Sequence, residues 1–138
     1  MTTAAPSTTA EPTVLFAQEG PIAILTLNRP ASLNSLTRQM HRDLWGALDK
    51  VEADESIRAL VLTGAGRAFC AGADLSEFDF RAGDDIMFRA DPGPVIDQAF
   101  NPTTRRLMAV RVPTVCAVNG VAAGAGASVA MAWLAGRS

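Results

Sequence analysis

Apolar residues recur along this chain with the periods of short strands and amphipathic helices. Residues 14–17 and 22–27 are predicted strands, and Glu19-Gly20-Pro21 predicts the turn of a hairpin between them. Thr37 is a suitable N-cap for a helix that ends near Ala53. The apolar stripe of this helix, at helical spacing, comprises Met40, Leu44, Ala47, Leu48 and Val51.

The rest of the chain continues the same alternation. Two apolar runs, residues 57–63 and 112–118, are typical of strands buried on both faces of a parallel sheet. Helices are predicted over residues 94–110 and from residue 123 to about 134, and residues 79–94 are polar enough to predict a mobile loop. Strands that alternate with helices indicate an α/β fold with crossover connections.

Composition narrows the class of protein. The chain has 138 residues, of which 49% are hydrophobic, and a net charge of −2, so we expect one globular domain and no nucleic-acid partner. No apolar run reaches the length of about 18 residues that a membrane span needs. Residues 1–13 have the composition of a disordered leader, whereas residues 14–138 form the domain. Cys70 and Cys116 lack CxxC spacing, which favours reduced thiols and a cytoplasmic protein.

Three common motifs are incomplete in this sequence. Gly124-Ala125-Gly126 would need a third glycine at Val129 to complete a dinucleotide-binding fingerprint, and no Lys-Ser/Thr pair completes a P-loop. Ser128 lies in a near match to the nucleophile elbow GxSxG, but inside the first turns of a helix rather than directly after a strand. His41, the only histidine, lies beside the apolar stripe, so we expect it at the surface or rim and not as the base of a serine hydrolase.

Two loops of small residues offer bare backbone donors instead. Cys70-Ala71-Gly72-Ala73-Asp74 lets a ligand approach the main chain, and at Gly124-Ala125-Gly126 a helix begins whose first N–H groups lack internal partners. The helix dipole favours negative charge at this end. Together the loops predict an oxyanion hole for the oxygen of a thioester, although small residues also permit tight packing of a helix on a sheet.

Four motifs in order resemble the crotonase (enoyl-CoA hydratase/isomerase) superfamily over residues 14 to about 132. They are Asn28-Arg29-Pro30 with Leu33-Asn34-Ser35-Leu36, then Leu62-Thr63-Gly64, then the segment Phe69 to Leu75, and then Ala117-Val118-Asn119-Gly120. The resemblance implies a spiral of ββα units, of which this chain is the N-terminal portion. Residues 119–127 are most similar to the branch that isomerises ring-epoxidised phenylacetyl-CoA thioesters.

The resemblance also implies roles for individual residues. The backbone N–H groups of Ala73 and Ala125 would form the oxyanion hole. Coenzyme A, which is part of the substrate rather than a cofactor, would run past Ala31, Leu33, Ala71, Asp74 and Leu75. The neighbouring substrate-binding positions are Gly72, Gly124 and Ser128. No metal site is implied.

Two departures from the family pattern leave alternatives open. Hydratases carry their first catalytic glutamate where this chain has Ser128, and a hydroxyl cannot replace a water-activating carboxylate. Family members are about twice as long, so the acid/base of an isomerase and the helices that build trimers or hexamers are expected beyond Ser138, and 138 residues alone are expected to be inactive. Relatives also place a short strand between Ala132 and Trp133. The alternatives to an isomerase are a hydratase or double-bond isomerase of fatty-acid oxidation, and a non-catalytic acyl-CoA-binding or assembly subunit.

Overall fold

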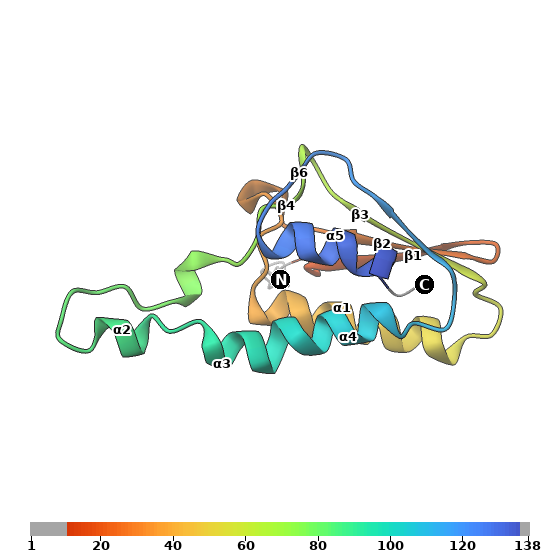
Figure 1. The fold of residues 1–138 in the computed structure, drawn as a ribbon. Coiled ribbons are helices and arrows are strands. Elements are labelled where there is room, and N and C mark those ends of the chain that lie inside the picture. Colours follow the sequence, from red (N-terminus) through yellow and green to blue (C-terminus); the bar gives the residue numbers. More distant parts are fainter. Residues whose placement is uncertain (1–10, 136–138) are drawn as a thin grey trace, which may run out of the picture.

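Three successive ββα units make up the part of the chain that the computed structural model describes, residues 11–135, with side chains through residue 132 (Figure 1). The first contains β1 (Val14–Glu19), β2 (Ile22–Leu27) and α1 (Arg38–Ala53). The second contains β3 (Ala59–Gly64), β4 (Ala68–Cys70) and a helical run of α3 (Gly93–Val95), the π-helical η3 (Ile96–Phe100) and α4 (Asn101–Met108). The third contains β5 (Thr114–Ala117), β6 (Val121–Ala122) and α5 (Ala125–Ala135).

The strands form two sheets. The larger has the order β1-β2-β3-β5, in which β1 and β2 are antiparallel and the pairs β2–β3 and β3–β5 are parallel. The smaller pairs β4 with β6 in parallel, so the second strands of the last two units lie together. Helices α1 and α4 run side by side beneath the larger sheet, and α5 lies on the same side (Figure 1). The predicted α/β class with crossover connections is confirmed.

Helix α1 has the predicted stripe, cap and core. Thr37 accepts a hydrogen bond from the amide of Met40 at 3.1 Å, as an N-cap should. At the other end, the Arg111 guanidinium donates to three backbone carbonyls, two of them at the C-terminal end of the helix and one in the segment that follows. These are the carbonyls of Val51, Asp54 and Ile57. All five residues of the predicted stripe are buried.

The larger sheet is less buried than the apolar runs predicted. Leu60 and Leu62 of β3 are buried, but Val61 is only half-buried. In β5, Val115 is 63% exposed, so the prediction that residues 112–118 are buried on both faces is wrong. Successive side chains of a strand point to opposite faces, and within residues 11–135 the helices cover one face of the sheet (Figure 1). Side chains on the other face therefore remain accessible in the described chain.

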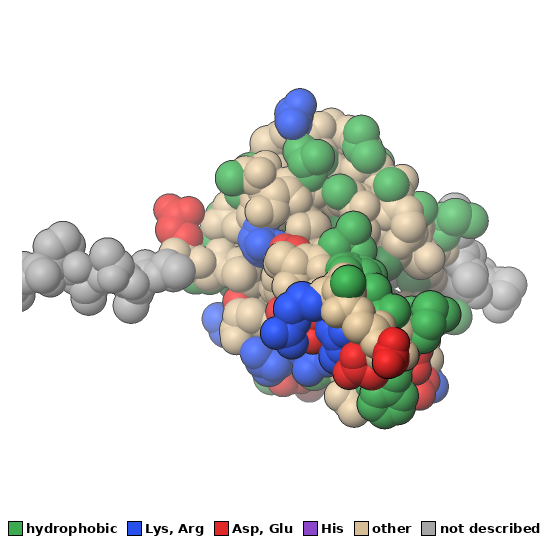
Figure 2. Space-filling view, turned by 90° about the vertical axis from the view of Figure 1, so that its left-hand side faces the viewer, with side chains coloured by type: hydrophobic (Ala, Val, Ile, Leu, Met, Phe, Trp, Pro, Cys, Tyr) green, Lys and Arg blue, Asp and Glu red, His purple; other side chains and the backbone are tan. Residues whose placement is uncertain are grey.

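Residues 79–92 form an arm that extends from the body of the molecule (Figure 1). The arm contains a short helix, α2 (Ile86–Arg89), where the sequence predicted only a loop. Asp79 pairs with Arg81 at 2.7 Å and with Arg89 at 2.6 Å, and Phe88 is exposed. Figure 2 looks onto this end of the molecule and shows charged side chains of both signs beside apolar ones. The mobility of this arm stays a prediction.

The remaining predictions concern the two ends of the chain, membrane-spanning helices and metal-binding side chains. Residues 1–10 and 136–138 lie outside the described residues, but the Thr13 hydroxyl donates to Asp43 at 2.7 Å and so ties the entry of β1 to α1. Helix α5 begins two residues later than predicted and continues through the point where relatives were expected to insert a strand. Within the described range, no helix is long and apolar enough to cross a membrane, and no three His, Cys, Asp or Glu side chains could jointly hold a metal ion.

Candidate functional site

The two small-residue loops meet at one end of the smaller sheet. Parallel pairing of Ala68 with Val121 and of Cys70 with Ala122 places the exits of β4 and β6 at the same edge. The amide of Ala123 donates to the carbonyl of Cys70 at 3.0 Å and so extends this pairing beyond β6. Segments some fifty residues apart in the sequence therefore lie against each other where each strand ends.

Ala73 and Ala125 lie on these facing loops. The amide nitrogen of Ala125 is 3.8 Å from the position that a Cβ atom would take at Gly72. Covalent geometry keeps the next amide nitrogen, that of Ala73, within about 4 Å of that position, so the two nitrogens are at most about 8 Å apart. Gly72 has φ +114, which a residue with a side chain rarely adopts, so its glycine permits both this turn and the close approach.

The directions of these two N–H groups follow from their neighbours' hydrogen bonds. Leu36 donates to the carbonyl of Gly72 at 2.7 Å and accepts from the amide of Asp74 at 3.0 Å. In such a bridge the intervening residue, Ala73, directs its own N–H away from Leu36. Ala125 is the first residue of α5, whose leading N–H groups have no partner inside the helix. Within residues 11–135, neither N–H has a hydrogen-bond acceptor.

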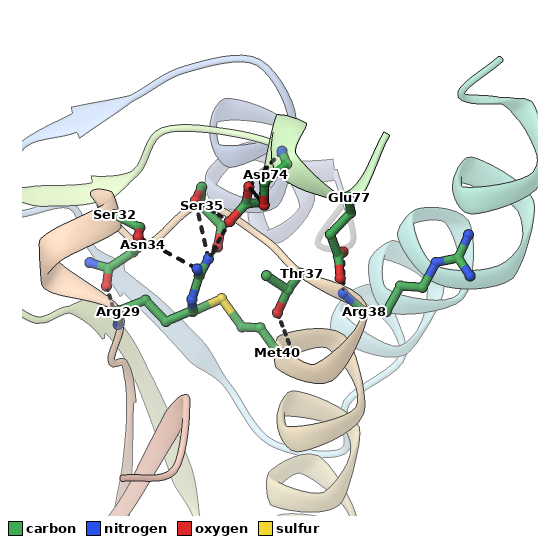
Figure 3. Close-up of polar contacts among 10 residues, drawn as sticks. Arg29, Ser32, Asn34, Ser35, Thr37, Arg38, Met40, Asp74 and Glu77 are labelled. Carbon is green, nitrogen blue, oxygen red and sulfur yellow. Dashed lines mark hydrogen bonds and ion pairs between the residues drawn. The ribbon is translucent and has the colours of Figure 1, made fainter. Parts of the chain in front are cut away.

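The segment from Arg29 to Leu36 holds the first loop in place (Figure 3). Arg29 bonds through its guanidinium to the carbonyl of Ser35 at 2.6 Å and to the Asp74 carboxylate at 2.9 Å. Asn34 is fully buried and bonds to three backbone groups, the Arg29 amide at 2.8 Å and the carbonyls of Ala65 at 3.0 Å and Ala68 at 2.9 Å. These bonds connect the loop before α1 to both ends of the turn that joins β3 to β4.

Hydrogen bonds lower the pKa of Asp74, so this carboxylate keeps its charge in more acidic solution than an ordinary aspartate does. The Ser76 hydroxyl, then the Ser76 amide and the Arg29 guanidinium, hold the pKa of Asp74 at about 2. The same contacts begin the short helix η2 (Leu75–Glu77), for which Asp74 is the N-cap. A fixed carboxylate therefore lies one residue after Ala73.

The structure brings together most of the expected substrate-binding residues. The amide of Ala71 donates to the carbonyl of Leu33 at 3.0 Å, so these two residues are adjacent beside Gly72 and Asp74. Gly124 and Ser128 lie with Ala125 at the start of α5, where Ser128 is exposed. Ala31, in η1 (Pro30–Ser32), and Leu75, at 67% exposure, are on the surface nearby but make no hydrogen bond to the others.

A cavity of about 250 Å³ adjoins the start of α5. Ala125, Ser128 and Val129 form one wall, and the opposite wall comes from α1 and from the helical run before β5. That wall comprises His41, Ile96, Phe100, Asn101, Thr103 and Thr104. Four of the nine lining residues are apolar and five carry a polar side chain, so the cavity offers both apolar surface and hydrogen-bonding groups to a small organic ligand.

His41 is the residue that sequence analysis misplaced. Its ring is 1% exposed rather than at the surface or rim, and burial lowers its pKa to about 4. Its Nδ1 lies 2.7 Å from the Thr103 hydroxyl, and the ring packs edge-on against Phe100 with 4.5 Å between ring centroids. A signal was present in the sequence, because His41 precedes Leu44 by three positions and Leu48 by seven and so shares their face of α1.

Comparison with known proteins agrees with this architecture. The family model described as "Enoyl-CoA hydratase/isomerase" matches residues 17–133. Over 86% of its length the chain is 48% identical to the 1,2-epoxyphenylacetyl-CoA isomerase of Escherichia coli K12, of which it covers 44%. Over 83% of its length, the chain is 39% identical to a probable peroxisomal enoyl-CoA hydratase of Arabidopsis thaliana, and it covers 40% of that protein.

Solved structures share the fold. A Pseudomonas aeruginosa protein superposes with a TM-score of 0.76 at 38% identity, over 90% of this chain and 51% of that one. An enoyl-CoA hydratase/carnitine racemase from Magnetospirillum magneticum superposes with a TM-score of 0.74 at 34% identity, over 87% of this chain and 43% of that one. The chain thus spans about half the length of the proteins it matches, and the expected crotonase-type fold is confirmed. It belongs to the enoyl-CoA hydratase/isomerase family.

Proposed function

We propose that this protein binds an acyl-CoA thioester and stabilises its enolate with the backbone N–H groups of Ala73 and Ala125. The observation that carries the proposal is the approach of the Ala125 amide to Gly72, with neither N–H bonded to another described residue. The N-terminus of α5 adds a favourable potential for negative charge. Each donor of this kind contributes roughly 3–4 kcal/mol to lowering the barrier.

The cavity beside Ala125 is the proposed site of the acyl group. Coenzyme A, as part of the substrate, would pass Leu33, Ala71 and Asp74, where the hydrogen bonds between the loops keep the main chain in place. Gly72 lets the thioester approach closely because it has no side chain. No cofactor is proposed, because the chemistry needs only oxyanion donors and a group that moves a proton.

We propose isomerisation, with a ring-epoxidised phenylacetyl-CoA as the substrate class. Ser128 stands where the family resemblance puts the first glutamate of hydratases, and none of the nine described residues around the cavity is a carboxylate. The 48% identity to the E. coli isomerase supports this choice. The acid/base is expected elsewhere in the full natural chain, which we propose to be a cytoplasmic homotrimer or hexamer.

Two other functions remain alternatives. The likeness to the Arabidopsis protein, a probable enoyl-CoA hydratase, supports a hydratase or double-bond isomerase of fatty-acid oxidation. The carboxylate-free cavity wall supports a non-catalytic acyl-CoA-binding or assembly subunit.

The test is turnover of the full natural chain on matched thioesters, with and without the Ala125 N–H. Ala125→Pro removes this donor at the first helical position, where proline is well tolerated, whereas Ala125→Gly keeps it. We expect Ala125→Pro to lower kcat on the ring-epoxide substrate by 10²–10³-fold and Ala125→Gly to stay within a few-fold of wild type, with unchanged melting temperatures.

The outcomes separate the candidates. A loss below about tenfold in Ala125→Pro contradicts the oxyanion role, since one such donor is worth roughly a hundredfold or more. Hydration of crotonyl-CoA without turnover of the epoxide identifies the hydratase alternative. Tight binding of both thioesters without any turnover identifies the binding subunit.

A further inference from the structure

Phe100 belongs to the cavity wall opposite Ala125, at the point where the helical run before β5 changes its geometry. The run is π-helical over Ile96–Phe100 and α-helical afterwards. Pro102, two residues after Phe100, has no N–H with which to continue a regular helical pattern. Single π-helical turns within α-helices are frequent at functional sites, and this one ends in the wall of the cavity.

The Phe100 side chain lies on the face of the run that is turned toward the cavity. Ile96, Phe100 and Thr104 follow one another at intervals of four, and positions at this spacing share one face of a helix. All three residues line the cavity. Ile96 is 41% exposed, whereas the Phe100 ring packs against the buried ring of His41. Phe100 therefore forms a deeper part of the wall than Ile96 does.

Neighbouring side chains hold the Phe100 ring in place. The ring meets His41 edge-on, with 4.5 Å between the ring centroids. His41 is itself fixed, because it is 1% exposed and its Nδ1 lies 2.7 Å from the Thr103 hydroxyl. Phe100 also packs against the hydrophobic core, and a closely packed interior leaves no space into which the ring could turn. The wall is therefore rigid at this position.

We propose that Phe100 is a specificity-determining residue that limits the length of the acyl group. The inference rests on the proposed acyl-CoA function and deepens it, because it names the substrate class as acyl groups no longer than hexanoyl or with a single ring. A longer straight chain that enters beside Ala125 would meet the Phe100 ring across the cavity. The volume of about 250 Å³ agrees with such a limit, since pockets for larger ligands span roughly 300–1,000 Å³.

The test is a series of saturated thioesters that differ only in chain length: butyryl-, hexanoyl-, octanoyl- and decanoyl-CoA. Dissociation constants are measured by calorimetry on the full natural chain of wild type, Phe100→Ala and Phe16→Ala. Phe16 is the matched control, because it is also a half-buried phenylalanine packed against the hydrophobic core but is not among the described residues that line the cavity. Phe100→Leu is measured as well, because it keeps more of the packing and so tests the inference even where Phe100→Ala does not fold.

In wild type, we expect affinity to rise from butyryl- to hexanoyl-CoA, because each buried methylene contributes about fourfold. Beyond hexanoyl-CoA the affinity should stop rising. Phe100→Ala should bind octanoyl-CoA about tenfold more tightly than hexanoyl-CoA, since two further methylenes can then be buried. Phe100→Leu should show a gain of about threefold between the same two ligands, because it opens less space. Phe16→Ala should level off at hexanoyl-CoA, as wild type does.

A steady rise in affinity through decanoyl-CoA in wild type overturns the inference and leaves the proposed acyl-CoA function intact. A wild-type limit that both Phe100 variants retain overturns it too, since another residue then sets the limit. An equal gain for octanoyl-CoA in Phe16→Ala also overturns it, because that result indicates a general loosening of the core. Failure of wild type to bind any of the four thioesters overturns the proposed function together with the inference.

Discussion

Replacement of Asn34 by alanine should destabilise the protein more than any other single loss of a polar side chain in the loop before α1. Asn34 is fully buried and its amide group makes three hydrogen bonds to backbone groups, with Ala65, with Ala68 and with Arg29. Figure 3 shows the bond to Arg29. Its φ is +55, in the left-handed region that asparagine tolerates better than alanine. Asn34→Ala removes the bonds and adds strain at the same time.

The magnitude follows from these contacts. Three hydrogen bonds at about 1 kcal/mol each give about 3 kcal/mol, and the left-handed conformation adds roughly 1 kcal/mol for alanine. We therefore expect the free energy of unfolding to fall by about 4 kcal/mol. Asn28→Ala is the matched control, because the Asn28 side chain makes only solvent-exposed hydrogen bonds and its loss should cost less than about 1 kcal/mol.

The assay is urea unfolding of the full natural chain, followed by circular dichroism at fixed protein concentration. Asn34→Ala should lower the midpoint without changing the m-value, because stability changes while the surface exposed on unfolding does not. The segment that Asn34 holds also bonds to Gly72 and Asp74 through Leu36, so affinity for acyl-CoA should fall as well. A loss below about 1 kcal/mol, or one equal to that of Asn28→Ala, would refute the reasoning, since three buried bonds would then be worth no more than exposed ones.

Three further predictions concern other parts of the molecule. The pKa of His41 is lowered from 6.5 to about 4, so between these values the unfolded chain binds more protons than the folded one. The free energy of unfolding therefore decreases as pH falls through this window, by roughly 3 kcal/mol in all. When urea midpoints are measured across this pH range, His41→Phe should show a smaller decrease than wild type, because it lacks this titrating group. Ser128→Ala should stay within a few-fold of wild-type kcat, because no base within residues 11–135 makes a hydrogen bond to Ser128 that would activate it as a nucleophile; a loss of about a thousandfold would instead indicate a serine-centred mechanism. Gly46→Ala should raise the free energy of unfolding by about 0.5–1 kcal/mol, because a Cβ at this exposed position inside α1 meets nothing within 4 Å; a lower urea midpoint would contradict the helix assignment there.

Local sequence was sufficient for the longer strands and helices and for the two loops, but it did not predict the short elements β4, β6 and α2. The stripe from Met40 to Val51 predicted α1 and its buried face, because a helix period leaves little freedom about which side chains share a face. The small residues around Gly72 and Gly126 predicted close backbone approach. The structure agrees, since a Cβ at Gly126 would collide with the Cys70 carbonyl. These features depend on residues within a few positions of one another.

Burial was predicted less well. Val115 is exposed although its apolar run is typical of a buried strand, because burial depends on what packs on each face of the sheet. His41 was expected at the surface, yet Phe100 and Thr103 enclose it from helices some sixty residues later in the chain. The helix period places His41 on the apolar face of α1, but nothing local in the sequence says that Phe100 and Thr103 pack against it.

The sequence by itself thus determined the alternation of strands and helices, the α1 core face, the capping residue Thr37 and the two small-residue loops. These follow from backbone propensity, side-chain period and the space that small residues leave. The ββα units and the donor roles of Ala73 and Ala125 were implied by the family resemblance. Only the tertiary structure decided that the Ala125 amide approaches Gly72, that a cavity opens beside it, and that His41 presents a neutral ring in the cavity wall. The approach and the cavity depend on distances between segments far apart in the chain, and these distances are set by how the helices and sheets pack. The neutral ring depends on the low dielectric that the same packing creates around His41.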